Sequence, residues 1–232
     1  METILREGLS AWGLSDGGVP RLLDFSRRLL AQNEVMNLTA ITAPADVARL
    51  HLLDCAALLS HYDLRGKTVV DVGTGAGFPG MVLRILEPTC RLTLLDSLGK
   101  RVDWLREVCA EMGLSDVDCV HARAEDFAGE QRERFDIAAS RAVAPLNILC
   151  ELALPLVRVG GMFLAMKSVE SDAELDAAKN AVETLGGEVA EVWDYTIPTA
   201  AVRHRVIAIG KPRPTPPRFP RPYAKIKKQP LK

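Results

Sequence analysis

Two different spacings of apolar residues follow one another along the chain, and the change comes near Gly66. Before it, apolar residues recur at helical spacing in residues 21–32, which follow Pro20, and in residues 46–62, which follow Pro44. Proline suits the first turn of a helix, so both stretches are predicted helices. After Gly66, short apolar runs alternate with amphipathic stretches, which predicts strands alternating with helices.

This second part of the chain is predicted to contain seven strands and four helices. The strands are expected at residues 67–72, 91–96, 117–122, 134–140, 161–167, 188–195 and 203–210. The helices are expected at residues 79–87, 100–113, 146–157 and 173–186. Such alternation is typical of an α/β fold with a mostly parallel sheet and helices on both faces, and ligands of such sheets bind at the carboxyl ends of the strands.

The pattern divides the chain into three regions. They are an N-terminal helical extension (residues 1–65), a strand-and-helix domain (residues 66–210) and a C-terminal tail rich in proline and basic residues (residues 211–232). The tail is the only low-complexity stretch, and we expect it to lie outside the packed domain.

Composition places the chain among soluble globular proteins. Its 232 residues, 48% of them hydrophobic, are enough for a sizeable core. The 5 cysteines are odd in number and scattered, and no histidine lies at ligand spacing, so neither a disulfide framework nor a metal site is predicted. The charged start and the lack of a long uncharged apolar run predict neither a secretory signal nor a membrane helix, so we expect a cytoplasmic protein.

Charge is distributed unevenly along the chain. Residues 211–232 hold 8 of the 29 basic residues and no acidic residue, which leaves 21 basic against 30 acidic residues in the rest, a charge of −9 against +8. Such a tail indicates contact with phosphates, and a solvated, disordered terminus explains the composition equally well.

A glycine-rich turn, VDVGTGAGFPG, follows the first predicted strand at residues 70–80. The glycines at 75, 77 and 80 match the G-x-G-x-x-G turn of dinucleotide sites, while Asp71 and the glycines at 73, 75 and 77 match the D-x-G-x-G-x-G turn of S-adenosylmethionine sites. Both turns let backbone amides approach a ligand closely. Both also use an acidic residue at the end of the second strand to hold ribose hydroxyls, and Asp96 supplies it.

Asp71 separates the two possibilities. A dinucleotide lays a pyrophosphate over the helix start, whereas S-adenosylmethionine carries an ammonium and a sulfonium that a carboxylate attracts. Asp71 therefore favours S-adenosylmethionine, with S-adenosylhomocysteine as the product. Polar residues after two further strands agree, because Glu125 and Asp126 follow the third strand at the expected adenine position and Arg141 follows the fourth, facing the place of methyl transfer.

Other chemistries find less support in the sequence. GKT at residues 66–68 precedes a strand and lacks the first glycine of a P-loop, and the motifs G-x-S-x-G and H-E-x-x-H are absent. His51 and Asp54 lie three residues apart on an apolar helix, so His51 is interpreted as a packing residue. The Pro-Pro-aromatic loop of amino-group methylation is missing, and no proline precedes Cys150 as attack on a pyrimidine would require, so both absences favour a target atom with an exposed lone pair.

Nine segments occur in a characteristic order: NLTAI, HLLDC, VDVGTGAGFPG, LLDSLGKRVDWL, ARAEDF, SRAVAPL, GGMFLAMKS, RHRVIAIGK and the basic, proline-rich end. Together they closely resemble the small-subunit ribosomal RNA methyltransferase G family, also called glucose-inhibited division protein B, from about residue 20 to the C-terminus. The resemblance implies the Rossmann-like fold of class I S-adenosylmethionine-dependent methyltransferases. It also implies a bacterial enzyme that methylates N7 of one guanine in 16S ribosomal RNA.

The resemblance assigns Gly73, Phe78, Ala124, Glu125 and Arg141 to the cofactor, and Arg123, Lys167 and Arg203 to RNA or catalysis. With the residues named above, the expected cofactor contacts are Asp71, Gly73, Gly75, Gly77, Phe78, Asp96, Ala124, Glu125 and Arg141. The catalytic candidates are Arg141, Arg123 and Lys167. Guanine N7 carries a lone pair and no proton, so no general base is required and the main task is to position the reactants.

The expected partner is 16S ribosomal RNA or the small ribosomal subunit, bound by a monomer. Its phosphates are expected to contact Lys100, Arg101, Arg123, Arg203, His204, Arg218, Arg221, Lys225, Lys227 and Lys228, and Phe219 and Tyr223 are available to stack on bases. Removal of the tail is expected to weaken RNA methylation and to spare cofactor affinity.

Three alternatives remain. A small-molecule methyltransferase would share the cofactor site but has no use for the basic tail. A nicotinamide-dinucleotide-dependent dehydrogenase would accept the glycine spacing but not Asp71. A non-catalytic RNA-binding protein would bind no S-adenosylmethionine.

Overall fold

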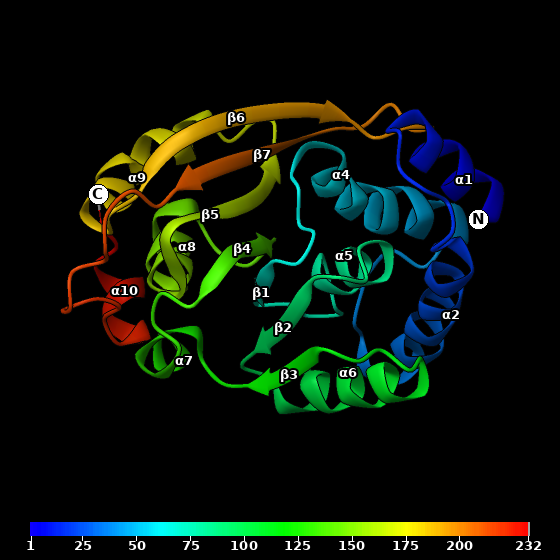
Figure 1. The fold of residues 1–232 in the computed structure, drawn as a ribbon, viewed down its shortest axis with the longest axis horizontal. Coiled ribbons are helices and arrows are strands. Elements are labelled where there is room, and N and C mark those ends of the chain that lie inside the picture. The colour runs from blue at the N-terminus through cyan, green and yellow to red at the C-terminus, as the bar shows by residue number, and fades with distance from the viewer. Residues whose placement is uncertain (232) are drawn as a thin grey trace.

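A seven-stranded sheet runs through the computed structural model, which describes residues 1–231 (Figure 1). The strands are β1 (Thr68–Val72), β2 (Arg91–Asp96), β3 (Val117–His121), β4 (Phe135–Arg141), β5 (Val157–Ser168), β6 (Glu188–Thr196) and β7 (Arg203–Gly210). Their order in the sheet is β3-β2-β1-β4-β5-β7-β6. All neighbouring pairs are parallel except those of β7, which runs antiparallel to β5 and β6. The predicted α/β fold with a mostly parallel sheet is confirmed.

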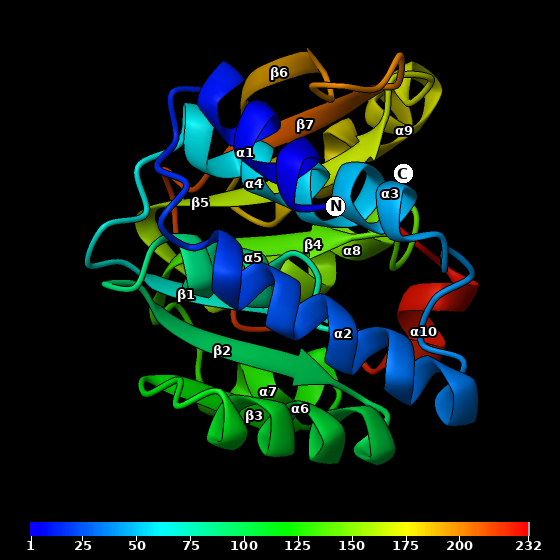
Figure 2. The same cartoon turned by 90° about the vertical axis from the view of Figure 1, so that its right-hand side faces the viewer.

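Helices cover both faces of the sheet (Figures 1 and 2). One face carries α1 (Glu2–Ala11), α2 (Val19–Met36), α3 (Pro44–Asp46), the π-helix η1 (Val47–Leu53), α4 (Asp54–His61), α5 (Gly80–Leu86) and α6 (Gly99–Glu111). The other carries α7 (Ala124–Glu130), α8 (Leu146–Ala153), the short helix η2 (Leu154–Leu156), α9 (Asp172–Thr184) and α10 (Tyr223–Lys228). The sequence pattern missed the short helices α1, α7 and α10.

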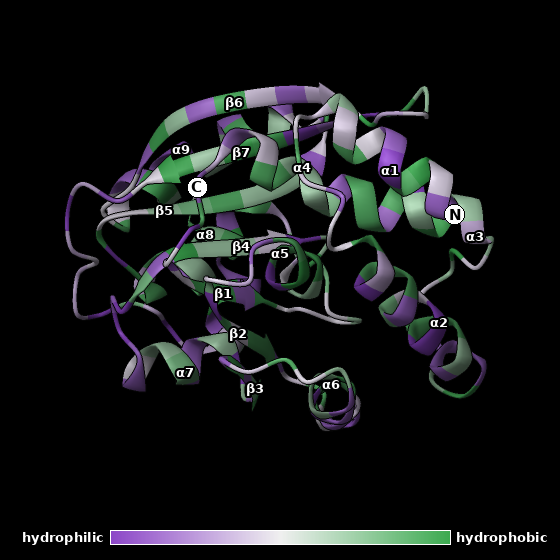
Figure 3. Cartoon of the chain, turned by 45° about the vertical axis from the view of Figure 1, so that its right-hand side comes forward, coloured by the Kyte–Doolittle hydropathy of each residue, from purple (hydrophilic) through white to green (hydrophobic). Residues whose placement is uncertain are grey.

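The sheet separates two hydrophobic clusters. One contains Leu22, Phe25 and Leu52 of the N-terminal helices together with Val69 of β1. The other contains Phe163 of β5 and residues of α8 and α9. The apolar colouring of β4 and β5 in Figure 3 follows from this burial on both sides. Central strands of a parallel sheet are near-continuous apolar runs for the same reason.

The order of the strands sets the position of the site. The chain proceeds outward from β1 to β2 and β3, and then returns to place β4 on the other side of β1. Ligands of open α/β sheets bind outside the carboxyl ends of the strands at such a switch point. The glycine-rich turn after β1 and Arg141 at the end of β4 therefore lie at the same edge.

The helix predicted at residues 46–62 is not regular. Its first part, η1, is a π-helix, and the α-helix α4 begins only at Asp54. Short π-helical segments inside helices are frequent at functional sites. Within η1 the carbonyl oxygen of Leu50 accepts a hydrogen bond of 3.0 Å from Arg141, a contact that apolar spacing cannot reveal.

The expectation that the tail lies outside the packed domain is wrong for residues 211–231. Lys211 is buried and its Nζ lies 3.0 Å from Oε1 of Glu133. Phe219 and Ile226 are buried in the cluster around α8. Arg221 pairs with Glu151 at 2.6 Å. Composition could not show this, because the acidic partners lie in other parts of the chain.

Two kinds of structural feature are missing from residues 1–231. No helix there is both long and apolar enough to cross a membrane. The same residues contain no group of three or more His, Cys, Asp or Glu side chains that could hold a metal ion.

We expect Glu151→Gln to loosen the tail. The Glu151 carboxylate is fully buried and accepts hydrogen bonds from the backbone and guanidinium of Arg221. A glutamine amide at this position would leave the positive charge of Arg221 without its anionic partner. Breaking a buried ion pair costs about 3 kcal/mol, and urea unfolding should show a loss of that order. Hydrogen exchange should become faster in residues 213–231. Lys227→Gln, at an exposed position of α10, is the control and should change stability by less than about 0.5 kcal/mol. Equal stability of the two variants would contradict the prediction.

Candidate active site

The turn after β1 depends on glycine at three positions. Gly73, Gly75 and Gly77 have φ values of 72°, 58° and 92°, which side chains with a Cβ rarely adopt. The amides of Gly73 and Thr74 donate to the carbonyl oxygen of Leu95 on β2, at 2.8 and 3.0 Å. The turn is therefore fixed against the end of β2.

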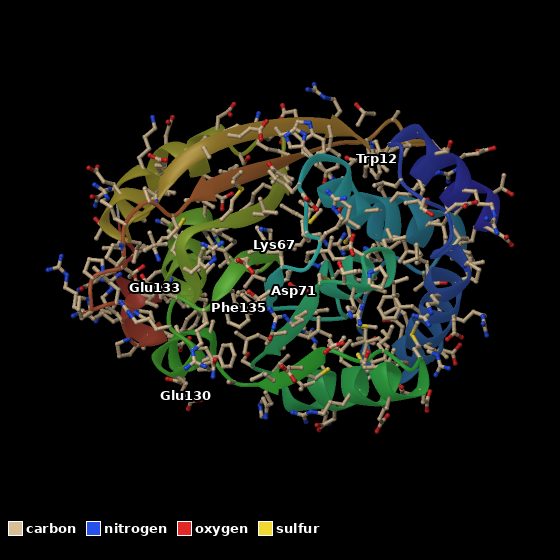
Figure 4. The ribbon with its side chains drawn as sticks, in the orientation of Figure 1. Trp12, Lys67, Asp71, Glu130, Glu133 and Phe135 are labelled. Atoms are coloured by element: carbon tan, nitrogen blue, oxygen red, sulfur yellow. The ribbon has the colours of Figure 1, made fainter. Side chains whose placement is uncertain are left out.

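Asp71 lies under this turn, inside the sheet (Figure 4). Its Oδ2 accepts hydrogen bonds from the hydroxyl of Thr74 at 2.6 Å and from the amide of Gly80 at 2.7 Å. Its Oδ1 has no hydrogen-bond partner among the described residues, and burial raises the pKa of the carboxyl to about 6. The expected contact of Asp71 with the cofactor stays a prediction, and in the structure Oδ2 of this carboxylate holds the turn from below.

A cavity of about 110 Å³ lies above the turn, at the carboxyl ends of β1, β2 and β3. It is lined by Val72, Gly73, Leu95, Asp96, Ser97, Ala122, Arg123, Ala124, Glu125, Val143, Leu152 and Tyr223. Ligand pockets are usually larger, about 300–1,000 Å³. Val143 narrows this one, since a Cβ on Gly73 would lie 2.6 Å from its Cγ2. Four expected cofactor residues, Gly73, Asp96, Ala124 and Glu125, meet here.

Asp96 is positioned by the backbone around it. Its Oδ2 accepts from the amide of Gly75 at 2.8 Å, and its Oδ1 accepts from the amide of Leu98 at 2.9 Å. Each carboxylate oxygen can accept a further bond, so Asp96 suits ribose hydroxyls. Gly75 itself faces open space, because an added Cβ would meet nothing closer than 3.9 Å. Carboxylates and an open glycine backbone fit a ribose-bearing cation such as S-adenosylmethionine.

Tyr223 brings the tail to the same cavity. It is the first residue of α10, and its ring lies 4.8 Å from the guanidinium carbon of Arg123. The Nε of Arg123 lies 3.6 Å from Oε1 of Glu125, so both charged groups are held beside the cavity wall. The sequence pattern assigned Tyr223 to stacking on RNA bases and did not place it at the cofactor cavity.

A second cavity, of about 530 Å³, lies at the ends of β4 and β5. It is lined by Ile41, Leu50, His51, Asp54, Arg141, Ala142, Met166, Lys167, Ser168, Tyr195, Val202 and His204. The consecutive residues Ala142 and Val143 line the larger and the smaller cavity respectively, so the two adjoin across this loop. A cavity of about 800 Å³ at the opposite edge, among residues 91–93 and 116–120, contains none of the expected site residues.

Asp54 is the centre of the hydrogen bonds in the second cavity. Its Oδ1 accepts from Nδ1 of His204 at 2.6 Å and from the hydroxyl of Tyr195 at 2.7 Å, and its Oδ2 accepts from Arg141 at 2.9 Å. Burial alone would raise the pKa of Asp54, but the bond from His204 and the charge of Arg141 hold it below its ordinary value. Asp54 therefore remains an anion in the wall of this cavity.

Arg141 is placed where the sequence predicts it, at the end of β4, but its guanidinium is already engaged. It contacts Nδ1 of His51 at 3.0 Å and lies 4.9 Å above the ring of Phe78. Phe78 is buried, stacks on His51 at 4.7 Å and lines neither cavity. The structure thus uses Phe78 as a platform under Arg141 and His51.

His51 does more than pack. Burial and the neighbouring charge of Arg141 lower its pKa to about 4, so the ring is neutral near pH 7, and its Nε2 lies 2.7 Å from the hydroxyl of Thr39. The sequence pattern placed His51 and Asp54 on an apolar helix and favoured a packing role for His51. The only sequence signal for this cluster was the NLTAI and HLLDC segments, which contain Thr39, His51 and Asp54.

The expected catalytic and RNA-binding side chains differ in how available they are. Lys167 is mostly buried and donates to Glu174 at 2.6 Å and to the carbonyl oxygen of Ala144 at 2.8 Å. Arg101 lies 3.9 Å from Asp96, and Arg221 is engaged with Glu151. The exposed members of the set are Lys100, Arg123, Arg203, Arg218, Lys225, Lys227 and Lys228. His204 lines the second cavity instead of the outer surface.

Comparison with known proteins gives consistent results across the chain. A family model described as rRNA small subunit methyltransferase G matches residues 19–202. The chain is 44% identical to the ribosomal RNA small subunit methyltransferase G of Alkaliphilus metalliredigens, over 99% of this chain and 98% of that protein. The protein of the same name from Clostridium perfringens is 43% identical over 86% of this chain and 85% of its own length.

Solved structures are similar at the level of the fold. M. jannaschii TYW2 in complex with AdoMet superimposes with a TM-score of 0.54 at 14% identity, covering 68% of this chain and 74% of that one. TrmN from Thermus thermophilus gives 0.51 at 23% identity, covering 68% and 48%. The fold class that the resemblance implied is confirmed.

We expect Gly75→Ala to weaken S-adenosylmethionine binding. The new Cβ would project into the open space over the turn, where it would meet the ligand and no protein atom closer than 3.9 Å. Gly113→Ala is a matched control, because Gly113 has φ +60° and open space but lies at the end of α6, away from the site. Both variants should lose about 1 kcal/mol of stability from backbone strain. Calorimetry should show a loss of cofactor affinity for Gly75→Ala only, and equal affinities would contradict the assignment.

We also expect Tyr223→Ala to lower cofactor affinity, contrary to the expectation that the tail serves RNA alone. An aromatic contact contributes about 0.5–1.5 kcal/mol, so the dissociation constant for S-adenosylmethionine should rise roughly 2- to 10-fold. Tyr223→Phe keeps the ring and should bind like the parent. If the alanine variant binds the cofactor as tightly as the phenylalanine variant, Tyr223 is not a cofactor contact.

Proposed function

Because the chain belongs to the rRNA small subunit methyltransferase G family, we propose that it transfers a methyl group from S-adenosylmethionine to N7 of a specific guanine in 16S ribosomal RNA. The observation that carries this proposal is 44% identity over 99% of the chain to a ribosomal RNA small subunit methyltransferase G. The chain is thus a methyltransferase, and the small-molecule, dehydrogenase and non-catalytic alternatives are not favoured.

The residues around the smaller cavity would hold the cofactor. The turn at Gly73, Gly75 and Gly77 would pass under it, Asp96 would accept from its ribose hydroxyls, and Ala124 with Glu125 would contact the adenine end. When bound, S-adenosylmethionine supplies an electrophilic methyl group on a sulfonium. Asp71 would contribute by fixing the turn, because its hydrogen bonds are to Thr74 and Gly80.

The second cavity would hold the acceptor base. It adjoins the first across residues 141–143, so a base placed there would face the cofactor cavity. N7 carries a lone pair and no proton, so the protein needs to orient the base and exclude water and does not need to remove a proton. Positioning of this kind contributes as much as about 7–11 kcal/mol. We assign it to Arg141, whose guanidinium is fixed by Asp54, His51 and Phe78.

Lys167 and Arg123 would act at the borders of the two cavities. Lys167 lines the acceptor cavity while its ammonium ties Ala144 of the loop after β4 to Glu174 of α9, so it would hold that loop in place. Arg123 is half exposed beside the cofactor cavity, with Tyr223 and Glu125 as neighbours. Its guanidinium is free to contact a phosphate as well.

Exposed cations near the site would bind the RNA backbone. The set comprises Lys100, Arg123, Arg203, Arg218, Lys225, Lys227 and Lys228. It excludes Arg101, which lies beside Asp96, and Arg221, which is bound to Glu151. Phosphate contacts make affinity depend steeply on salt and add no sequence information directly. The deep, narrow major groove of an RNA helix hides N7, so the target guanine should lie in a loop or an opened segment. We further propose a cytoplasmic, monomeric enzyme.

The test is methylation of small ribosomal subunits, and of free 16S RNA, from cells that lack this protein. With labelled S-adenosylmethionine, the purified protein should add one methyl group per 16S molecule, and mapping should find 7-methylguanosine at one position. The Gly75→Ala variant is the negative control. Methylation of another atom, or of no RNA, would refute the proposal.

A further inference from the structure

The second cavity contains a hydrogen-bond donor that the family assignment does not explain. We propose that His204, at the start of β7, donates from Nε2 to O6 of the target guanine and thereby selects guanine over adenine. This inference rests on the proposed function, because it assumes that a guanine occupies the cavity of about 530 Å³. It reassigns His204 from phosphate contact to base recognition.

The imidazole of His204 is held in one orientation. Its Nδ1 lies 2.6 Å from Oδ1 of Asp54, whose side chain is only 2% exposed. Asp54 is fixed in turn by the hydroxyl of Tyr195 and the guanidinium of Arg141. A ring anchored through one nitrogen presents the other in a fixed direction. Within residues 1–231 no hydrogen-bond partner is found for Nε2 of His204, and the half-buried ring forms part of the cavity wall.

The composition of the wall favours a base over a phosphate. Leu50, Met166, Val202 and Tyr195 supply apolar and aromatic surface. The cations in the lining, Arg141 and Lys167, are already paired with Asp54 and Glu174. A flat aromatic base is stabilised by such surface, whereas a phosphate needs several donors from water or cations. Exposed Arg203, the neighbour of His204 on β7, lies outside the cavity lining and is better placed for phosphate.

The edge of guanine that carries N7 also carries O6, and both are acceptors. Adenine has an amino donor where guanine has O6. A donor fixed opposite that position therefore bonds to guanine and is left facing another donor when adenine enters. The carboxylate of Asp54 behind the ring partly offsets the charge of a protonated His204, which limits its repulsion of the positive charge that develops on the guanine ring.

Protonation decides whether Nε2 donates. The hydrogen bond to Asp54 raises the pKa of His204 above its ordinary 6.5, against burial and the charge of Arg141. The protonated ring donates from both nitrogens. In the neutral ring, Nδ1 keeps its proton and donates it in the hydrogen bond to Asp54, so Nε2 is only an acceptor. Donation to O6 is therefore present below the pKa of His204 and lost as pH rises through it.

Other charged or titratable groups face the same cavity from the surrounding elements: Asp54 from α4, His51 from η1, Arg141 from β4, Lys167 from β5 and Tyr195 from β6. The pKa of Asp54 is lowered and that of His51 is about 4, so both titrate well below the range in which His204 does. Burial raises the pKa of Tyr195, which moves its titration further above that range.

Two substitutions separate base recognition from a structural role. In His204→Gln the amide nitrogen reaches the position of Nε2, and in His204→Asn it occupies the position of Nδ1 and keeps the bond to Asp54. We expect His204→Asn to lower kcat/KM for methylation of small subunits roughly 10- to 100-fold, because one charge-assisted hydrogen bond is lost. His204→Gln should lower kcat/KM less. S-adenosylmethionine affinity should be unchanged in both. The reverse order of activities would mean that His204 only supports Asp54, and would overturn the proposal.

The decisive experiment changes the substrate. Small subunits are rebuilt with 2-aminopurine riboside, which keeps N7 but lacks O6, in place of the target guanosine. The unaltered protein should methylate it at least about 10-fold less efficiently than guanosine, whereas His204→Asn should barely distinguish the two. Equal rates for the unaltered protein on both substrates, or equal discrimination by the variant, would overturn the proposal. If guanosine subunits are not methylated at all, the proposed function fails instead.

The pH profile provides an independent readout. The kcat/KM of the unaltered protein should fall as pH rises through the pKa of His204, while that of His204→Gln stays flat and cofactor affinity stays constant. Arg203→Gln should instead reduce the salt dependence of RNA binding and leave the pH profile unchanged. A profile of the same shape in the glutamine variant would contradict donation from His204.

Discussion

The carboxylate of Asp54 joins three parts of the chain that are far apart in sequence. It accepts hydrogen bonds from Arg141 at the end of β4, Tyr195 on β6 and His204 on β7, the last of them 150 residues away. A buried carboxylate without such partners would cost several kcal/mol, so the N-terminal helix that carries Asp54 and the edge of the sheet stabilise each other. The second cavity, which we assign to the acceptor base, lies where these elements meet.

A second buried carboxylate, Asp71, has a different task. One of its oxygens holds Thr74 and Gly80, while the other has no partner among the described residues, and burial raises its pKa to about 6. The hydrogen bonds of Asp71 therefore support the turn. Asp96 and Glu125, which we propose as cofactor contacts, line the smaller cavity above the turn. An acidic residue in a glycine-rich turn is thus compatible with a structural role even where the ligand is a cation.

The tail combines anchoring and exposed charge. Lys211 pairs with Glu133 and Arg221 pairs with Glu151, which attaches the tail to the domain. Phe219 and Ile226 pack against the core. The cations on α10 remain exposed, and its first residue, Tyr223, reaches the cofactor cavity. A single segment therefore connects the surface that we assign to RNA with the site that we assign to the cofactor.

The sequence by itself determined the seven strands, the edge of the sheet where ligands bind and the glycine turn, because apolar spacing and the need for positive φ are local properties. It also predicted that Asp96, Glu125 and Arg141 lie at the same edge of the sheet, since each stands at the end of a strand or soon after it. It could not tell whether Asp71 faces the ligand or the interior, because the same letters are compatible with both. Nor could it pair Asp54 with His204 or Arg221 with Glu151. Only the tertiary structure decided these contacts, because they depend on how distant segments pack, which no local spacing encodes.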